Sequence, residues 1–312
     1  MRINANTHKR RGKEMKLSEF IIWLVPFAET NYSEKTAEWY RVSLNALIKH
    51  VGDLDIRNVT PFDLEKFKMQ RKKEVSAATV NNNIRAIKSC FGKATTLELI
   101  KKDPTKKVKA IREEEQAPVY LSESDYKTFL RAMMDEPWFG KVVLFAIETG
   151  LRRGEITNLR KEDVDLPNKL INIHSNTSYR VKFGKRRVVT LNEVSLQIVT
   201  ERMRLSSSQF LFTDAQDKPI RPELLTKKFR KYVDKLGLNK KYHFHSLRHT
   251  FGTLLSQNKV PLRDIQELMG HSRITVTEKY MHVSLDHLHE STSVMSTLTA
   301  ATTGLFAWDL SE

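Results

Sequence analysis

Apolar side chains recur every three or four positions through most of residues 16–112, which is the repeat of amphipathic helices. One such helix follows Ser33, a residue type that caps a first turn, and ends at Gly52, a residue type that terminates a last turn. A second starts at Pro61, because proline is favoured at the first helical position, and a third opens at Ser76. The pattern predicts a small helical domain over residues 16–112.

The helix that opens at Ser76 has two unlike faces. Its apolar face carries Val80, Ile84, Ile87, Phe91 and Ala94. The other face places amides beside cations, namely Asn81, Asn82, Asn83, Arg85 and Lys88. Each of these residues alone is typical of a solvated surface, but amides next to cations are the groups that contact phosphates and base edges. We therefore predict nucleic-acid contacts at Asn81, Asn82, Arg85 and Lys88.

The second half of the chain mixes helical and strand patterns. An apolar helix covers residues 142–147, and residues 170–173 and 187–191 then alternate or run apolar as short strands do. A basic turn at residues 181–185 separates these strands, and helical patterns fill the rest. The expected fold is mainly α with a small β-sheet (α+β), with this second domain over residues 120–290.

Three further segments join or flank the two domains. Residues 113–119 are charged and contain Pro118, which discourages helix, so they are expected to form a linker; an ordinary solvated loop is the alternative. Residues 1–15 form a flexible basic arm that touches phosphate or is simply disordered. Residues 291–312 form a C-terminal tail, whose apolar end at residues 305–310 docks into a neighbouring subunit or packs on its own domain.

The chain is strongly basic, with 53 Lys and Arg against 37 Asp and Glu and a net charge of +16. Such an excess favours a polyanionic partner, either a nucleic acid or an anionic membrane surface. The longest apolar run, Phe20 to Ala28, contains Pro26 and falls far short of the ~20 residues of a spanning helix. Residues 1–14 also lack the apolar core of a signal peptide. A nucleic acid is therefore the predicted partner.

The cysteine content bears on disulfides, metal sites and the cellular compartment. Cys90 is the single cysteine of the chain, which excludes an intrachain disulfide, and no group of Cys and His has the spacing of zinc ligands. We expect a cytoplasmic protein that holds no metal.

Two pairs of residues are spaced to grip a phosphate. Arg152 and Glu155 stand three apart at an expected helix start, and an arginine held by a carboxylate is a preorganised bidentate donor. A surface ion pair of little energetic value is the alternative interpretation. His245 and Arg248 are also three apart and can present a second guanidinium beside a hydrogen-bond donor. His249 is expected to be a local structural histidine.

Four more residues are candidates for proton and phosphoryl chemistry. Lys182, on the basic turn, can act as a general acid if neighbouring cations lower its pKa. Lys185 is a rival for that role and is also predicted to contact the nucleic acid. A solvent-facing lysine is the alternative for both. His271 can donate to a non-bridging phosphate oxygen. Tyr280 is a candidate nucleophile, but its ordinary pKa near ~10 requires a nearby base or cationic field.

The order and spacing of these residues resemble those of the tyrosine recombinases of the phage-integrase type. The sequence Thr-Gly-Leu-Arg at residues 149–152 resembles the first arginine box of that family, and residues 245–251 resemble the second. Residues 268–271, followed nine residues after the histidine by Tyr280, resemble the third. The resemblance covers essentially the whole chain.

The resemblance implies a site-specific DNA recombinase in which the tyrosine attacks a scissile phosphate, forms a 3′-phosphotyrosyl bond and releases a 5′-hydroxyl. The two arginines would clamp the non-bridging oxygens, the two histidines would donate further hydrogen bonds, and the lysine would protonate the leaving oxygen. Neither metal nor nucleotide cofactor is needed, because the phosphotyrosyl bond conserves the energy for rejoining. The implied catalytic residues are Arg152, Lys182, His245, Arg248, His271 and Tyr280, with Glu155 orienting the first arginine.

The same resemblance implies the partners. Family members act as a homotetramer on double-stranded DNA with inverted-repeat core sites and pass through a Holliday junction, in integration, excision or resolution of a mobile DNA element. An accessory directionality factor is a further partner that the resemblance allows. Residues 1–15 are too few for the additional arm-site domain of large integrases. A type IB topoisomerase and a catalytically silent DNA-binding regulator are the alternative functions.

Overall fold

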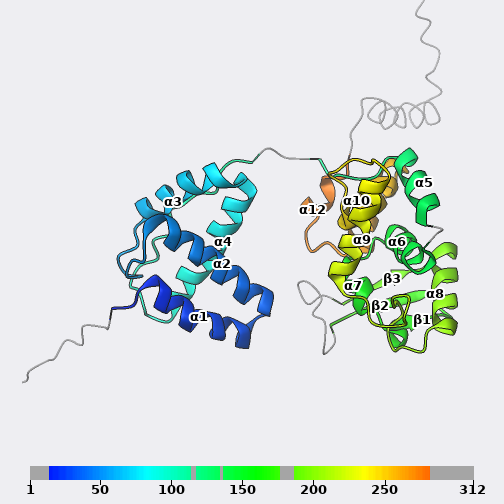
Figure 1. Ribbon diagram of the computed structural model, residues 1–312, viewed down its shortest axis with the longest axis horizontal. Helices are drawn as coiled ribbons and strands as arrows, with labels where there is room; N and C mark the ends of the chain where they lie inside the picture. The colour runs from blue at the N-terminus through cyan, green and yellow to red at the C-terminus, as the bar shows by residue number, and fades with distance from the viewer. Residues whose placement is uncertain (1–13, 114–116, 134–135, 176–185, 282–312) are drawn as a thin grey trace, which may run out of the picture. The chain divides into compact units, whose positions relative to one another are not determined.

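The computed structural model of the chain describes residues 14–113, 117–133, 136–175 and 186–281. The chain divides into two compact units, Met1–Glu115 and Gln116–Glu312, each with its own hydrophobic core (Figure 1). The predicted fold, mainly helical with a small sheet, is confirmed. The expected arm up to residue 13, the basic turn at 181–185 and the C-terminal tail lie outside the described residues.

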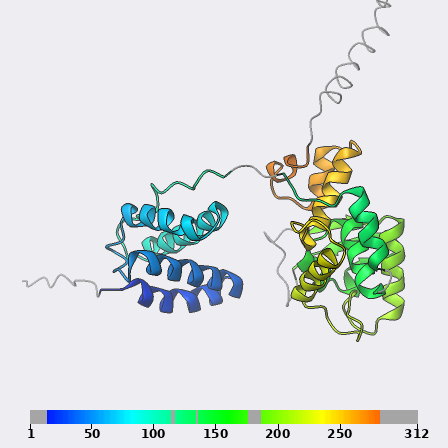
Figure 2. The ribbon, with the colours of Figure 1, turned by 45° about the horizontal axis from the view of Figure 1, so that its top comes forward.

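The first unit is a bundle of helices whose ends follow from local sequence. The helices are α1 (Leu17–Asn31), α2 (Glu34–Val51), α3 (Pro61–Glu74) and α4 (Ala77–Thr96). Ser33 and Ser76 each accept a hydrogen bond from the backbone N–H three residues later, as the sequence predicts. Helix α2 packs against the other three helices (Figure 2), and Phe20, Phe67 and Phe91 are fully buried between them.

The polar face of α4 differs from the prediction at two residues, because Asn83 is 5% exposed and donates to Ser43 Oγ at 3.1 Å, and Asn81 is buried as well. Asn81 is only 6% exposed, because its amide donates to the Ile111 carbonyl and accepts from the Ile111 N–H, both at 2.8 Å. This side chain ties α4 to the segment that leaves the unit, so the prediction that Asn81 contacts DNA is wrong. Asn82 and Arg85 are exposed on the same helix, and Lys88 is half-buried.

The second unit combines a short antiparallel sheet with helices. The sheet has the order β1 (Val164–Asp165), β2 (Leu170–Ile173) and β3 (Arg187–Thr190), and Ile171 pairs with Val189 across β2 and β3. A short 3-10 helix, η2 (Lys161–Asp163), precedes β1. The helices are α5 (Glu123–Ala132), α6 (Pro137–Thr149), α7 (Arg153–Asn158), α8 (Glu193–Leu205), α9 (Pro222–Lys235), α10 (Phe244–Gln257), α11 (Leu262–Met269) and α12 (Thr275–Glu278).

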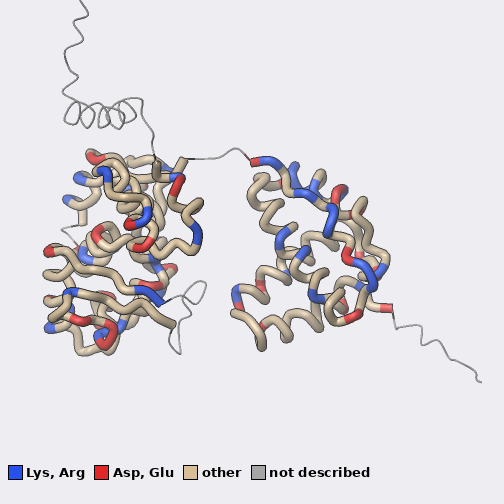
Figure 3. The backbone as a smooth tube through the Cα atoms, turned by 180° about the vertical axis from the view of Figure 1, so that it is seen from behind, with Lys and Arg blue, Asp and Glu red and all other residues tan. Residues whose placement is uncertain are grey.

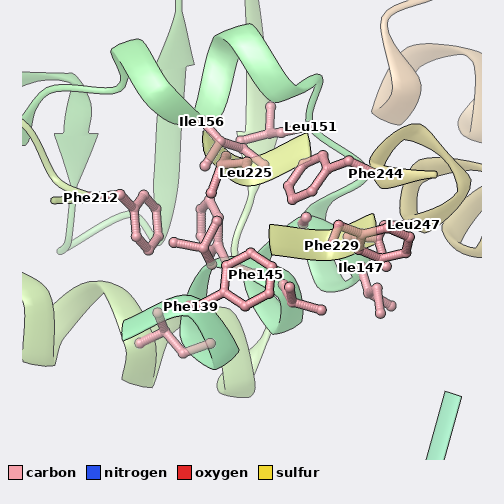
Figure 4. Close-up of a cluster of buried hydrophobic side chains, with 14 of the residues drawn as sticks. Phe139, Phe145, Ile147, Leu151, Ile156, Phe212, Leu225, Phe229, Phe244 and Leu247 are labelled. Carbon is pink, nitrogen blue, oxygen red and sulfur yellow. The ribbon is translucent and has the colours of Figure 1, made fainter. Parts of the chain in front are cut away.

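Helix α6 is the central element of this unit and packs against α7, α8 and α10. The ring centroid of Phe145 on α6 lies 4.7 Å from that of Phe212 (Figure 4). The ring of Phe129 of α5 lies equally close to that of Phe229 of α9. Aromatic side chains bury large apolar areas, so this cluster contributes much of the stability of the unit. It also fixes the end of α6, where the candidate site begins.

The distribution of basic residues and the character of the described helices agree with the sequence analysis. Lys and Arg occur on both units, as their spread along the sequence predicts (Figure 3). Within the described segments, no helix combines the length and the apolar character that a bilayer span requires.

Candidate active site

The turn between α6 and α7 positions the first arginine. Gly150 ends α6 with a φ of 60°, and a Cβ added there would lie 2.3 Å from the ring of Phe251. Glycine is therefore required where the backbone turns towards Arg152. The Arg152 N–H then donates to Glu155 Oε2 at 2.8 Å, a capping contact that starts α7.

Glu155 lies between two arginines. Its buried carboxylate accepts from Arg152 Nη1 at 2.9 Å and, through both oxygens, from Arg187 at 2.8 and 2.7 Å. Burial alone would raise the pKa of Glu155, but the hydrogen bonds and charge of Arg187, with the charge of Arg152, lower it to about 2. The carboxylate is therefore ionised at neutral pH and holds both guanidiniums. It is not the surface ion pair that the sequence left open.

Arg187 is a site residue that the sequence prediction missed. It lies on β3 two residues before the buried Val189, so both side chains point to the same face of the sheet. A cation on the buried face of a strand needs a partner, and this register was the signal that could have revealed it. The Arg187 side chain also covers Gly270, where an added Cβ would lie 2.5 Å from Arg187 Cδ.

Arg248 and Arg152 converge on two turns of the backbone. Arg248 of α10 is 2% exposed and donates to the Gly150 carbonyl at 2.6 Å and to the Met269 carbonyl. Arg152 Nη2 donates to the Gly270 carbonyl at 3.0 Å. Burial, and then the charge of Arg152, lower the pKa of Arg248 to about 9, which leaves it protonated at neutral pH. Both guanidiniums therefore donate to the turn at residues 269–270, and Arg248 also donates to the turn at Gly150.

The site histidines are neutral at physiological pH. His271, just after α11, shares a hydrogen bond with Thr277 Oγ1 at 2.8 Å. Desolvation and the charges of Arg248 and Arg152 lower the pKa of His271 to about 3, and desolvation and Arg248 lower that of His245 to about 4. A neutral imidazole still carries one N–H, so each ring can donate to an anion.

Tyr280 is 1% exposed and lies within this group. Its ring stacks parallel to His271 with centroids 6.3 Å apart, and its phenolic oxygen shares a hydrogen bond with His249 Nδ1 at 2.8 Å. Burial raises the pKa of Tyr280 to about 12, although Arg248 and Arg152 act to lower it. The interpretation of His249 as a local structural histidine is therefore incomplete, because this residue touches the candidate nucleophile.

The structure brings most of the predicted site together. Hydrogen bonds and ring contacts connect residues of α7, β3, α10 and the turns around α12, and Arg248 joins them through backbone carbonyls. The connected residues are Arg152, Glu155, Arg187, His245, Arg248, His249, His271 and Tyr280. Lys182 and Lys185 lie outside the described residues, so the identity of the general acid stays a prediction.

Comparison with known families follows the same division of the chain. Residues 119–287 match the phage integrase family, and residues 15–112 match the N-terminal domain of phage integrases. The chain belongs to the phage integrase family. It is accordingly a tyrosine recombinase, an enzyme that cuts and rejoins DNA strands at specific sites. This membership decides against the topoisomerase and the silent regulator.

Curated relatives match over most of their length. Tyrosine recombinase XerC of Lactobacillus leichmannii is 27% identical over 277 residues, which cover 83% of this chain and 92% of the relative. A tyrosine recombinase of Thermosipho africanus is 24% identical over 261 residues, which cover 81% and 90%. The match to both relatives therefore spans both units of the chain.

Solved structures share the fold. The Tn1549 transposon integrase in complex with a circular intermediate DNA superposes with a TM-score of 0.76 at 21% identity, over 90% of this chain and 99% of that one. A lambda integrase tetramer bound to a Holliday junction superposes with a TM-score of 0.69 at 16% identity, over 84% and 79%.

Replacing Arg187 with glutamine is expected to slow covalent cleavage of DNA by about 10²-fold at saturating DNA, because a loosened Glu155 misplaces Arg152. Single-turnover formation of the protein–DNA adduct measures this rate. Arg186→Gln, a change at the exposed neighbour on the same segment, is the matched control and should cleave at the wild-type rate. Equal rates for the two variants would show that Arg187 does not position the site.

Proposed function

We propose that Tyr280 attacks a scissile DNA phosphate, forms a 3′-phosphotyrosyl bond and releases a 5′-hydroxyl. Arg152 and Arg248 bind the non-bridging oxygens and stabilise the charge of the pentacoordinate transition state. His245 and His271 donate further hydrogen bonds. The observation that carries this proposal is the position of the Tyr280 phenol, stacked on His271 and within the field of both arginines.

Electrostatics support a phosphodiester as the ligand of this site. The pKa values of Arg248, His245 and His271 are all lowered by burial and by neighbouring positive charge. A site with this excess of cations gains stability when a phosphate enters it, because the anion offsets their mutual repulsion. In this proposal the Glu155 carboxylate neutralises part of the positive charge of the arginines, and it orients Arg152 without touching DNA. Lys182, or its rival Lys185, protonates the leaving 5′ oxygen in this proposal.

The proposed partner is double-stranded DNA with inverted-repeat core sites, bound by four copies of the chain. The lambda integrase tetramer on a Holliday junction supports this arrangement, because that protein shares the fold of both units. The exposed Asn82 and Arg85, with the half-buried Lys88, form the DNA-facing side of α4 in this proposal. An accessory directionality factor would set whether the reaction runs towards integration or excision.

Covalent capture on nicked duplexes tests the reaction. Duplexes are taken from the DNA that flanks the gene and carry a nick just beyond each candidate cleavage point. Cleavage then releases a short 5′-hydroxyl fragment that diffuses away, so the adduct cannot revert. We expect the protein on the 3′ end of the cut strand, with the attached peptide containing Tyr280. Attachment to a 5′ phosphate, or through another residue, would overturn the proposal.

DNA affinity is expected to fall steeply with salt, by at least about 10³-fold between 50 and 200 mM, because phosphate contacts release counterions. Fluorescence anisotropy with a labelled duplex measures the slope of log K against log salt. The double change Arg85→Gln with Lys88→Gln should reduce the slope by about two. Lys127→Gln, which removes an exposed lysine paired with Glu123, is the control. An unchanged slope in the double variant would remove α4 from the DNA interface.

A further inference from the structure

We propose that His249 is a further catalytic residue, which accepts the phenolic proton of Tyr280 as the tyrosine attacks phosphorus. This inference rests on the function proposed above and assigns the base of its first step.

The contact between these two residues is built into α10. The phenolic oxygen of Tyr280 lies 2.8 Å from His249 Nδ1. Gly252, three residues further along the same helix face, lies under the phenol: an added Cβ would be 3.1 Å from Tyr280 Cζ and 2.9 Å from Met269 Sδ. A larger residue there would press on the Tyr280 ring and on the Met269 side chain. Gly252, which makes room for the Tyr280 ring, and His249, which bonds its hydroxyl, therefore lie one turn apart on the same helix.

Other described groups near the phenol are poor proton acceptors. Arg152 and Arg248 are cations at neutral pH and cannot take a proton. His271 Nδ1 is engaged by Thr277 Oγ1 at 2.8 Å, and the hydrogen bond described for the Tyr280 phenol goes to His249 and not to His271. Among the residues that the structure describes, His249 is the hydrogen-bond partner of the phenolic oxygen.

The proton and the electrons balance in one step. As the bond from Tyr280 Oη to phosphorus forms, the O–H bond breaks and its proton binds the lone pair of His249 Nδ1, which requires the neutral ring to carry its hydrogen on Nε2. The bond from phosphorus to the 5′ oxygen breaks, and that oxygen leaves with the electron pair and is protonated by the general acid. In the rejoining step the same proton returns from His249 to Tyr280. The exposed His245 contacts His249 edge to face, with ring centroids 4.8 Å apart.

The surrounding charges make this transfer depend on DNA. The groups that face His249 are His243, His245 and Arg248 from α10 and its start, and Lys279 and Tyr280 from the turn after α12. Desolvation, and then the electrostatic influence of His245, Lys279 and Arg248, lower the pKa of His249 to about 3, while burial raises that of Tyr280 to about 12, so the proton stays on the phenol in the free enzyme. A bound phosphate adds negative charge beside the same groups, which raises the basicity of His249.

The test compares His249→Asn and His249→Ala with the wild-type protein in single-turnover cleavage of a nicked duplex. Asparagine can still accept the phenolic hydrogen bond but cannot take the proton. We expect both variants to bind DNA normally and to cleave about 10²- to 10³-fold more slowly. Free imidazole should restore part of the rate of His249→Ala, in proportion to the unprotonated form. His243→Asn, which removes an imidazole that is hydrogen-bonded to Ser246 instead, is the control and should cleave normally.

A second substrate distinguishes the loss of a general base from the loss of a general acid. A duplex with sulfur in place of the 5′ bridging oxygen has a better leaving group, so it relieves the need for a general acid but not for a base. We expect it to leave the defect of His249→Asn in place. Restoration by sulfur, a wild-type rate in His249→Asn, or a slowed His249→Ala that imidazole does not rescue would each overturn the assignment. Failure of the wild-type protein to form any adduct would instead overturn the proposed function.

Discussion

Replacing Tyr280 with phenylalanine is expected to abolish covalent capture of DNA, by at least about 10⁴-fold, and to leave DNA binding intact. The change removes the attacking oxygen alone. The phenylalanine ring can keep its place beside His271 and over Gly252, because the buried contacts of Tyr280 are made by its ring. The lost hydrogen bond to His249 costs about 1 kcal/mol, too little to unfold the unit. Denaturing gels of nicked-duplex reactions measure the adduct, and anisotropy measures binding.

Tyr242→Phe is the matched control for this change. Tyr242 is also buried in the second unit, and its hydroxyl donates to Asp125 at 2.7 Å. Its replacement therefore removes a buried phenolic hydrogen bond of the same kind without touching the site, and the variant should capture DNA as the wild-type protein does. A DNA adduct formed by Tyr280→Phe would show that another residue is the nucleophile.

Replacing Glu155 with glutamine is expected to lower the free energy of unfolding of the second unit by about 3–5 kcal/mol, because two arginines then lose their buried counter-charge. The carboxylate accepts hydrogen bonds from both, and its side chain is 0% exposed. Hydrogen exchange of amides in α6 and α10 reports the opening of this unit separately from the first. Cleavage should fall as well, since Arg152 loses the group that orients it.

The free energy of unfolding is expected to depend on pH through the Glu155 carboxylate. Because the folded pKa of Glu155, about 2, lies below the ordinary 4.5, its contribution is complete above about pH 4.5 and is lost as the pH falls towards 2. The Glu155→Gln variant should lack that part of the acid destabilisation. Glu123→Gln, at a side chain that is 79% exposed, should change stability by no more than about 0.5 kcal/mol. Equal effects of the two substitutions would show that the buried carboxylate does not hold the arginines.

Local sequence patterns predict where several helices begin and which residue types carry the chemistry. Ser33 and Ser76 cap their helices through contacts three residues away, and such contacts are readable because both partners lie within one helical turn. The three boxes located Arg152, Arg248 and Tyr280 because their order and spacing are themselves features of the sequence.

Which groups those residues contact follows from the folded chain and not from the sequence patterns. His249 bonds Tyr280 across 31 positions, Arg187 holds Glu155 across 32, and Asn81 turns away from solvent to bind Ile111 across 30. Neither helical periodicity nor capping carries information over such separations, since these contacts form only when segments distant in the sequence pack together within each unit. The sequence patterns therefore specified the reacting groups. The packing of elements distant in the sequence placed His249 as the base beside Tyr280, added Arg187 as a second cation beside Glu155, and buried the Asn81 amide.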